Sequence, residues 1–422
     1  MQLQSLLSEA ERQTFCEIYE RNRKRSSSLF DLIHADAYEE QPIALRHPFV
    51  FYEGHIPGFS FLTLVRFALG GVPIDETLER LFQRGIDPDS PEEARASGPT
   101  AWPKRSRVVA FANHCDARVY EAMRNARLDD PENPRLVGAE AVHTIIEHEQ
   151  MHQETLLYIL HQLDFARKKR ILQRHQDRPQ VASRRVHVDA GIATLGAVRG
   201  TIPFGWDNEF DETRVSVDAF EVDVDSVTNG NFLAFIEAGG DVPPFWRKCD
   251  GEWRLLTQFD LLPLPKSWPV YVTHEQATAY AGWKGMRLPT EAEYHRAAFG
   301  TPEGKERTYP WGDALPDATR GNFGFARYDP VPVGSYPRGA SAWGVNDLVG
   351  NAWEWTSTVF HPLPDFRAMA SYPVYSQDFF DGKHYVLKGA SPVTDVRLIR
   401  RSFRNWFRAD YRYVYAKFRC VT

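Results

Sequence analysis

The chain has 422 residues, of which 43% are hydrophobic and 25% are charged. This composition is typical of a soluble globular protein that is long enough for two or three domains. A formal net charge of −6 gives no electrostatic footprint for nucleic acid or for an anionic membrane. We therefore expect neither nucleic acid nor a membrane among its partners.

Targeting signals and cysteine usage point to the cytoplasm. No apolar stretch approaches the roughly 18–20 residues that span a bilayer, and the polar N-terminus does not resemble a secretory signal. Four cysteines are scattered without a CxxC pair: Cys16, Cys115, Cys249 and Cys420. This spacing suggests neither a zinc ribbon nor a disulfide scaffold, so we predict a cytoplasmic protein with reduced thiols.

Residues 1–178 are predicted to form a helical domain. Apolar residues recur there at helical spacing, and the expected helices cover 8–24, 27–36, 52–69, 75–84, 106–126 and 139–172. A loop over 85–103, rich in Pro, Asp and Gly, is long enough to have a function of its own. About four of these helices are principal ones, which predicts a four-helix bundle.

Two histidines on the last predicted helix form a candidate metal site. His148 and His152 are four residues apart and therefore lie one turn apart on the same helix face. Glu154 and His143 point elsewhere around the helix, so a third ligand must come from another segment, and the sequence offers His55. The alternative is that such a pair is merely a surface feature or a set of satisfied core residues.

A polar stretch with a central Pro, residues 174–185, is predicted to be a linker. Beyond it, residues 186–422 contain alternating, strand-like segments at 186–189 and 215–222 and many Gly, Pro and Trp residues. Only three helices are expected in this part, at 229–238, 273–284 and 290–299. The fold class is therefore α+β with two domains, of which the second is rich in loops.

Five segments of the second domain resemble the formylglycine-generating-enzyme type of C-type-lectin-like fold: 227–232, 287–294, 309–312, 344–355 and 417–420. Within them, Asn351 and Glu354 are polar residues in an aromatic setting, and we expect both to be paired and to support the fold. The oxidase that names this fold uses two cysteines near the end of the domain. The matching stretch, 389–407, contains none, so we do not expect that activity.

A DinB-type bundle ahead of this fold resembles the iron-dependent sulfoxide synthases of ergothioneine and ovothiol biosynthesis and their selenium counterparts, the selenoneine synthases. The resemblance covers nearly the whole chain. Its marks, in order, are Gly54-His55, the HxxxHxE run 148–154, Tyr372 to Ser376, and Arg404-Asn405-Trp406. Each mark is weak alone, but their joint order is specific.

This resemblance implies that His55, His148 and His152 hold one Fe(II). Three neutral imidazoles on one face suit Fe(II) and leave three positions open for substrates. Glu154 would then orient a ligand or anchor the helix. Tyr372 matches the active-site tyrosine of the family, which donates a proton or a hydrogen bond at the iron site; the alternative is an ordinary aromatic residue of a Pro-rich loop.

The same resemblance assigns Tyr375, Asn405 and Trp406 to the site for hercynine, the trimethylated histidine. The two aromatic rings would face its quaternary ammonium through cation–π attraction, and Asn405 would bond its carboxylate or a water. The alternatives are that Trp406 is a core residue and that Asn405 is a turn residue.

Two departures from the family concern the second substrate. Members that use γ-glutamylcysteine commonly have an Asp where this chain has Phe407, and a Gln where it has Met151. Ovothiol enzymes usually carry a methyltransferase domain, and the sequence ends at Thr422 without one. The resemblance therefore points to selenoneine synthesis from hercynine, a selenosugar and dioxygen, with Phe407 among the substrate-binding residues.

Three alternatives remain open. The first is a hercynine or histidine sulfoxide synthase that uses γ-glutamylcysteine or cysteine. The second is a DinB-type metal-dependent thiol transferase with zinc or nickel on the same three histidines. The third is a non-catalytic binding protein, since lectin-like folds also serve to display ligands.

Overall fold

A computed structural model describes residues 7–83, 85, 88, 90–96, 98–180 and 182–422. The chain divides into two compact units. Unit 1 consists of Met1–Ile171 and Met369–Pro373, and unit 2 consists of Leu172–Ala368 and Val374–Thr422. The predicted domain boundaries, 1–178 and 186–422, stay a prediction. Among the described residues, no helix combines the length and the apolarity that crossing a membrane requires.

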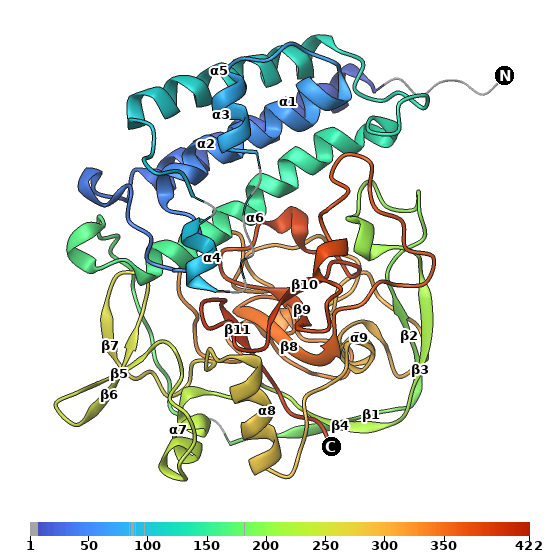
Figure 1. Ribbon diagram of the computed structural model, residues 1–422. Helices are drawn as coiled ribbons and strands as arrows, with labels where there is room; N and C mark the ends of the chain where they lie inside the picture. The colour runs from blue at the N-terminus through green and yellow to red at the C-terminus, as the bar shows by residue number, and fades with distance from the viewer. Residues whose placement is uncertain (1–6, 84, 86–87, 89, 97, 181) are drawn as a thin grey trace. The chain divides into compact units, whose positions relative to one another are not determined.

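Four long helical segments build unit 1 (Figure 1): α1 Glu9–Phe30, α2 Phe49–Ser60 with its π-helical continuation η2 Phe61–Ala68, α5 Arg105–Asn125 and α6 Glu140–Gln162. Helix α1 packs against α5 and α6, and α2 packs against the same two helices, which gives a four-helix bundle. Its shorter elements are η1 Ala35–Ala37, α3 Glu76–Leu81, α4 Pro91–Ala96, η3 Val137–Ala139 and η4 Phe165–Arg167.

Some predicted helix limits in unit 1 were wrong. The break expected after residue 24 is absent, because the buried Ser26 donates a hydrogen bond to Glu149 and keeps α1 regular through the serine-rich stretch. Helix α6 ends at Gln162 rather than near 172, since Leu163 is extended and Asp164 caps the short η4. The predicted loop over 85–103 contains α4, while its residues 86, 87, 89 and 97 lie outside the described residues.

The described residues of unit 2 form four small sheets. Its strands are β1 Arg185–Val188, β2 Gly191–Leu195, β3 Thr213–Val217, β4 Phe220–Asp223, β5 Trp246–Cys249, β6 Glu252–Leu256, β7 Leu261–Pro263, β8 Ala352–Val359, β9 His384–Ala390, β10 Asn405–Arg408 and β11 Ala416–Lys417. The sheet orders are β1-β4, β2-β3, β5-β6-β7 and β10-β9-β8-β11. All described pairings are antiparallel except β11 with β8. The predicted strand over 215–222 is in fact two strands, β3 and β4, which belong to different sheets.

The three helices predicted in unit 2 are confirmed as α7 Asn229–Glu237, α8 His274–Trp283 and α9 Glu291–Phe299. Each begins at a threonine whose hydroxyl accepts the third backbone N–H of the helix, while the side chain at that position bonds back: Thr228 with Asn231, Thr273 with Gln276 and Thr290 with Glu293. Such capping boxes satisfy N–H groups that have no partner within the helix. Short 3-10 turns occur at Asp207–Glu209, Pro337–Gly339, Gln377–Phe379 and Val396–Leu398.

The stretch predicted as a linker, 174–185, packs against unit 2 in its first part. Asp177 accepts a hydrogen bond from the Ser267 hydroxyl, and the Gln176 carbonyl accepts one from the Trp268 indole at 2.7 Å. His175 lies 3.3 Å from the carboxylate of the buried Asp329. This part of the chain is therefore an ordered segment of unit 2 rather than a free linker, because its polar groups form hydrogen bonds there.

The two polar residues expected to support the second domain are buried and paired. Asn351 donates to the Val331 carbonyl and accepts from the Val331 N–H, both at 2.9 Å. Glu354 is fully buried and binds Arg419 and Lys417. The prediction that these residues serve the fold is confirmed.

Candidate metal centre

Three histidines of unit 1 converge on one point. His55 comes from α2, and His148 and His152 come from successive turns of α6. Their ligand atoms all lie within 4.8 Å of one another. The Nε2 atom of His152 is 3.2 Å from that of His55 and 3.1 Å from that of His148. The structure therefore brings together the three predicted ligands and only these among the described residues.

A glycine explains how His55 is oriented. Its Nδ1–H donates to the carbonyl of Phe82 at 2.7 Å, which leaves the Nε2 lone pair facing the other two rings. The Phe82 ring packs directly on Gly54, where a Cβ atom would lie 2.6 Å from it. The Gly54-His55 dipeptide thus has a physical reason, because only glycine lets Phe82 approach closely enough to hold the histidine.

Burial keeps the three rings neutral. The exposed fraction is 1% for His55 and 3% for His148, while His152 is half-buried. Loss of hydration lowers the pKa of His55 to about 4 and lowers the pKa values of His148 and His152 well below the usual range. Neutral imidazole is the form that binds a metal, so three lone-pair nitrogens at this separation fit a divalent transition metal.

Glu154 and His143 lie outside this group, as the helix geometry predicted. Glu154 accepts a hydrogen bond from the hydroxyl of Tyr158, one turn along α6. His143 packs edge-on against Phe15, with ring centroids 5.0 Å apart. Glu154 therefore stabilises the helix, which is one of the two roles expected of it.

Aromatic rings enclose the histidines. Phe59 stacks on His148 at 3.5 Å between ring centroids, and Phe51 stacks on His55 at 4.8 Å. Tyr372 lies at the same place, with its ring 5.0 Å from Phe59 and 6.2 Å from His148. The structure thus brings the predicted active-site tyrosine to the histidines, although it is distant in sequence.

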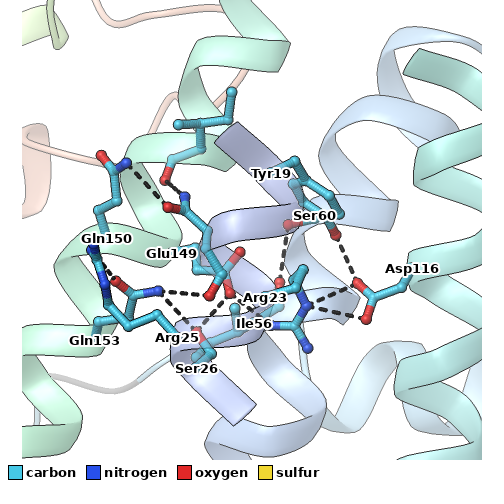
Figure 2. Close-up of polar contacts among 12 residues, drawn as sticks. Tyr19, Arg23, Arg25, Ser26, Ile56, Ser60, Asp116, Glu149, Gln150 and Gln153 are labelled. Atoms are coloured by element: carbon cyan, nitrogen blue, oxygen red, sulfur yellow. Dashed lines mark hydrogen bonds and ion pairs between the residues drawn. The ribbon is translucent and has the colours of Figure 1, made fainter. Parts of the chain in front are cut away.

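A buried polar network links helix α6 to helices α1 and α5 (Figure 2). Arg23 of α1 binds Glu149 of α6 at 2.7 Å and Asp116 of α5 at 3.0 Å. Ser26 donates to Glu149 at 2.6 Å, and Tyr19 donates to Asp116 at 2.8 Å. The helix that carries two of the three histidines is therefore fixed to two neighbouring helices by charge-assisted hydrogen bonds.

The predicted substrate residues of unit 2 fall into two groups. Tyr375 stacks on the buried Trp206 at 3.9 Å and meets Trp406 edge-on at 5.2 Å. Trp406 itself stacks on Phe360 at 4.3 Å with an interplanar angle of 8°. The two predicted aromatic residues are thus together, within an aromatic cluster that consists of Trp206, Phe360, Tyr375, Phe379 and Trp406.

Asn405 and Phe407 belong to the second group. Both lie on β10, where side chains alternate between the sheet faces, so they face away from Trp406. Asn405 accepts a hydrogen bond from the N–H of Trp406 at 2.9 Å, and it lies in a strand rather than in the turn that the alternative assumed. Phe407 stacks on Tyr411 at 4.7 Å. The four predicted residues therefore do not share one face.

Sequence reasoning missed several residues at these sites. Phe82 orients His55 through a backbone carbonyl, which no side-chain pattern reveals. Ser371 and Thr144 hold the segment that carries Tyr372, and Trp206 supports Tyr375. The spacing of Thr144 from His148 was the one available signal, since residues four apart share a helix face.

Comparison with known proteins agrees with this geometry. The DinB superfamily matches residues 18–156, and the sulfatase-modifying factor enzyme 1-like domain matches residues 172–422. The chain is 33% identical to "Hercynine oxygenase" of Mycolicibacterium thermoresistibile over 430 residues, which cover 93% of this chain and 91% of the relative. The chain belongs to the hercynine oxygenase family.

The chain is also similar to larger fungal proteins. "Ergothioneine biosynthesis protein 1" of Schizosaccharomyces pombe is 29% identical over 92% of this chain, which spans about half (53%) of that relative. Among solved structures, PvdO from Pseudomonas aeruginosa matches with a TM-score of 0.41 and 20% identity over 56% of this chain and 93% of that chain. The predicted fold class is confirmed: an N-terminal helical DinB domain precedes a β-containing formylglycine-generating-enzyme-type domain.

Proposed function

We propose that this protein is a non-heme Fe(II)- and dioxygen-dependent enzyme that forms a carbon–chalcogen bond on the imidazole of hercynine. The observation that carries the proposal is the convergence of three neutral imidazoles, the buried His55 and His148 and the half-buried His152, on one point. The names of the relatives, hercynine oxygenase and ergothioneine biosynthesis protein 1, support hercynine as the acceptor. Bound Fe(II) would supply the one-electron chemistry that dioxygen requires and that protein side chains lack.

The residues of the chain take distinct roles in this proposal. The three histidines hold the metal on one face and leave the other positions open. Tyr372 holds a phenolic proton beside His148 and donates it, or a hydrogen bond, during the reaction. Tyr375 and Trp406 receive the trimethylammonium of hercynine, since aromatic faces attract a cation that has no protons to donate. Asn405 lies on the other face of β10 from Trp406, so its predicted bond to the hercynine carboxylate or to a bound water is proposed separately from this aromatic pair.

For the second substrate we propose a selenosugar. Phe407 stacks on Tyr411 and offers no carboxylate to the ammonium group of γ-glutamylcysteine. A buried ammonium without a charged partner costs several kcal/mol, roughly a hundredfold or more in binding. An uncharged sugar avoids this cost, and its selenolate is a soft ligand. In this proposal dioxygen is the oxidant: the imidazole C–H and the sugar Se–H bonds are lost, a C–Se bond and an Se=O bond form, and the second oxygen atom leaves as water. Elimination would then break the bond between selenium and the sugar, which leaves an unsaturated sugar and a selenenic acid on the hercynine ring. A thiol donor is the second candidate, favoured by the names of the relatives.

The test is a competition assay under air. Protein loaded anaerobically with Fe(II) receives hercynine, a 1-seleno sugar and γ-glutamylcysteine in equal amounts. We expect oxygen uptake and a selenium-containing hercynine product. A sulfoxide formed in preference would place the protein in the thiol-using branch. No oxygen uptake with either donor would contradict the oxygenase proposal and favour the metal-dependent thiol transferase.

A variant sharpens the donor assignment. Phe407→Asp restores the carboxylate found in γ-glutamylcysteine-using members, so we expect its kcat/KM for that thiol to rise by about tenfold or more. Tyr413→Asp is the matched control, because it also replaces an aromatic residue near position 407 but one that is not among the predicted substrate-binding residues. An equal rise in both variants would mean that added negative charge, rather than position 407, is responsible.

A further inference from the structure

We infer that Ser371, Thr144 and Glu140 form a clamp that positions Tyr372 against the histidines. This inference rests on the role proposed for Tyr372. The backbone N–H of Ser371 donates to the Glu140 carboxylate at 2.8 Å. The hydroxyls of Ser371 and Thr144 are 2.9 Å apart and share one hydrogen bond. Both contacts lie within unit 1, to which Met369–Pro373 belongs.

The clamp lies on the same helix stripe as the metal ligands. Glu140, Thr144, His148 and His152 follow one another at intervals of four along α6, so each lies one turn from the next, with a drift of about 40° per step. The first two bind Ser371, and the next one lies beside the ring of Tyr372. The distance between tyrosine and histidine is therefore set by one rigid helix.

Tyr372 needs such support because its segment has no secondary structure of its own. Residues 369–373 form neither helix nor strand, so backbone ladders do not fix them. Thr144 is fully buried, and its hydroxyl would lack compensation for lost hydration without Ser371. Phe59, which stacks on His148, also contacts the Tyr372 ring edge-on and closes the other side. Ser371, Thr144 and Glu140 are thus positioning residues, since they act through Tyr372.

The test is a double-mutant cycle with Thr144→Val, which removes the hydroxyl at nearly constant volume. We expect kcat for hercynine turnover to fall about tenfold, because misplacing a reacting group by a fraction of an ångström costs that much or more. Fe(II) affinity should change less than about twofold, since the three histidines are untouched. In a Tyr372→Phe background the same replacement should cause no further loss.

Thr155→Val is the matched control. Thr155 is on the same helix and its hydroxyl donates to the Met151 carbonyl at 3.3 Å, so the variant loses a threonine hydroxyl and its hydrogen bond without touching Ser371. We expect its kcat to stay within about twofold of the parent protein. An equal loss for Thr144→Val with and without the Tyr372 hydroxyl would overturn the inference, because the effect would then be general destabilisation.

Hydrogen exchange in the metal-free protein separates this inference from the proposed function. In Glu140→Ala, the amide of Ser371 loses its acceptor, so we expect the peptide covering 369–373 to exchange about tenfold faster. Unchanged exchange would overturn the clamp even if hercynine is turned over. If the parent protein does not turn over hercynine but exchange is still accelerated in Glu140→Ala, the proposed function is contradicted. The contact between Glu140 and Ser371 would nevertheless be confirmed.

Discussion

The two units each contain a buried polar cluster, and the clusters differ in how their partners are supplied. In unit 2, both carboxylate oxygens of Glu354 bind the guanidinium of Arg419, which also donates to the carbonyls of Asp223 and Val224. Lys417 approaches the same carboxylate at 3.3 Å. Opposite charges and directed donors complete this cluster within the chain.

The histidine cluster of unit 1 is built in the opposite way. Its three rings are neutral, and their Nε2 atoms face one another rather than donors or acceptors of another kind. Within the described residues, the Nδ1 atoms of His148 and His152 have no hydrogen-bond partner. A buried group that the chain satisfies serves the fold, whereas buried lone pairs that converge without a donor indicate a ligand from outside.

The largest effect should come from breaking the completed cluster. Glu354→Ala leaves Arg419 and Lys417 as buried cations without their anion, and we expect a loss of about 3–5 kcal/mol in the free energy of unfolding. Urea titration measures it, with Glu237→Ala on the surface of α7 as the control. A loss below about 1 kcal/mol would mean that the cluster is not structural.

A smaller effect is expected where the fold supports the metal site. Gly54→Ala would push a Cβ atom into the Phe82 ring, so we expect a loss of about 1–3 kcal/mol in stability. Fe(II) affinity should fall by about tenfold or more, since His55 loses the carbonyl that orients it. Gly70→Ala serves as the control for adding a methyl group in unit 1. Its Cβ meets nothing within 4 Å, although positive φ there adds some backbone strain. Unchanged Fe(II) affinity in Gly54→Ala would contradict the claim that close packing of Phe82 on Gly54 orients His55.

An intermediate case is Lys388, which is buried and donates to the Arg401 and Phe403 carbonyls but lies 3.8 Å from Glu291. Burial lowers its pKa from 10.5 to about 8. Between these values the unfolded chain keeps the proton that the folded chain has lost, so stability rises with pH. Relative to Lys388→Met, we expect the parent protein to gain about 2 kcal/mol between about pH 7.5 and pH 9.5. Urea titration at each pH measures the free energy of unfolding of both proteins. The same pH dependence in both would contradict the prediction, because it would mean that the folded protein does not lower the pKa of Lys388.

The smallest effect on stability should come from the histidine cluster itself. His148→Leu removes a buried imidazole whose Nδ1 is unpartnered among the described residues, at the cost of its stacking on Phe59. We expect the metal-free variant to lie within about 1 kcal/mol of the parent in urea. If His148→Leu strongly destabilises the metal-free protein, His148 stabilises the fold and is not mainly a metal ligand.

Local patterns made much of the fold predictable. The threonine caps and the spacing of apolar residues define α7, α8 and α9 from the sequence. The continuity of α1 was not predictable, because it depends on the contact of Ser26 with Glu149, over a hundred residues apart. The C-terminal end of α6 was placed too late, although the Asp164 cap that follows it is local. The division of 215–222 into two strands depends likewise on which sheet each half joins.

The candidate site shows the same limit. Helix spacing alone paired His148 with His152 and excluded Glu154 and His143. It could not show that a backbone carbonyl orients His55, or that Ser371 returns to the same helix stripe. Asn405 and Phe407 lie on the opposite face from Trp406 because residues 405–408 form the strand β10, which the sequence analysis did not predict.

Anaerobic Fe(II) titration of the metal-free protein tests the metal assignment most directly. We predict one Fe(II) per chain in the parent protein, and loss of tight binding when His55, His148 or His152 is replaced by Ala. His143→Ala, a buried histidine of the same helix outside the cluster, should still bind one Fe(II). A His55→Ala protein that binds Fe(II) as tightly as the parent would contradict the three-histidine site.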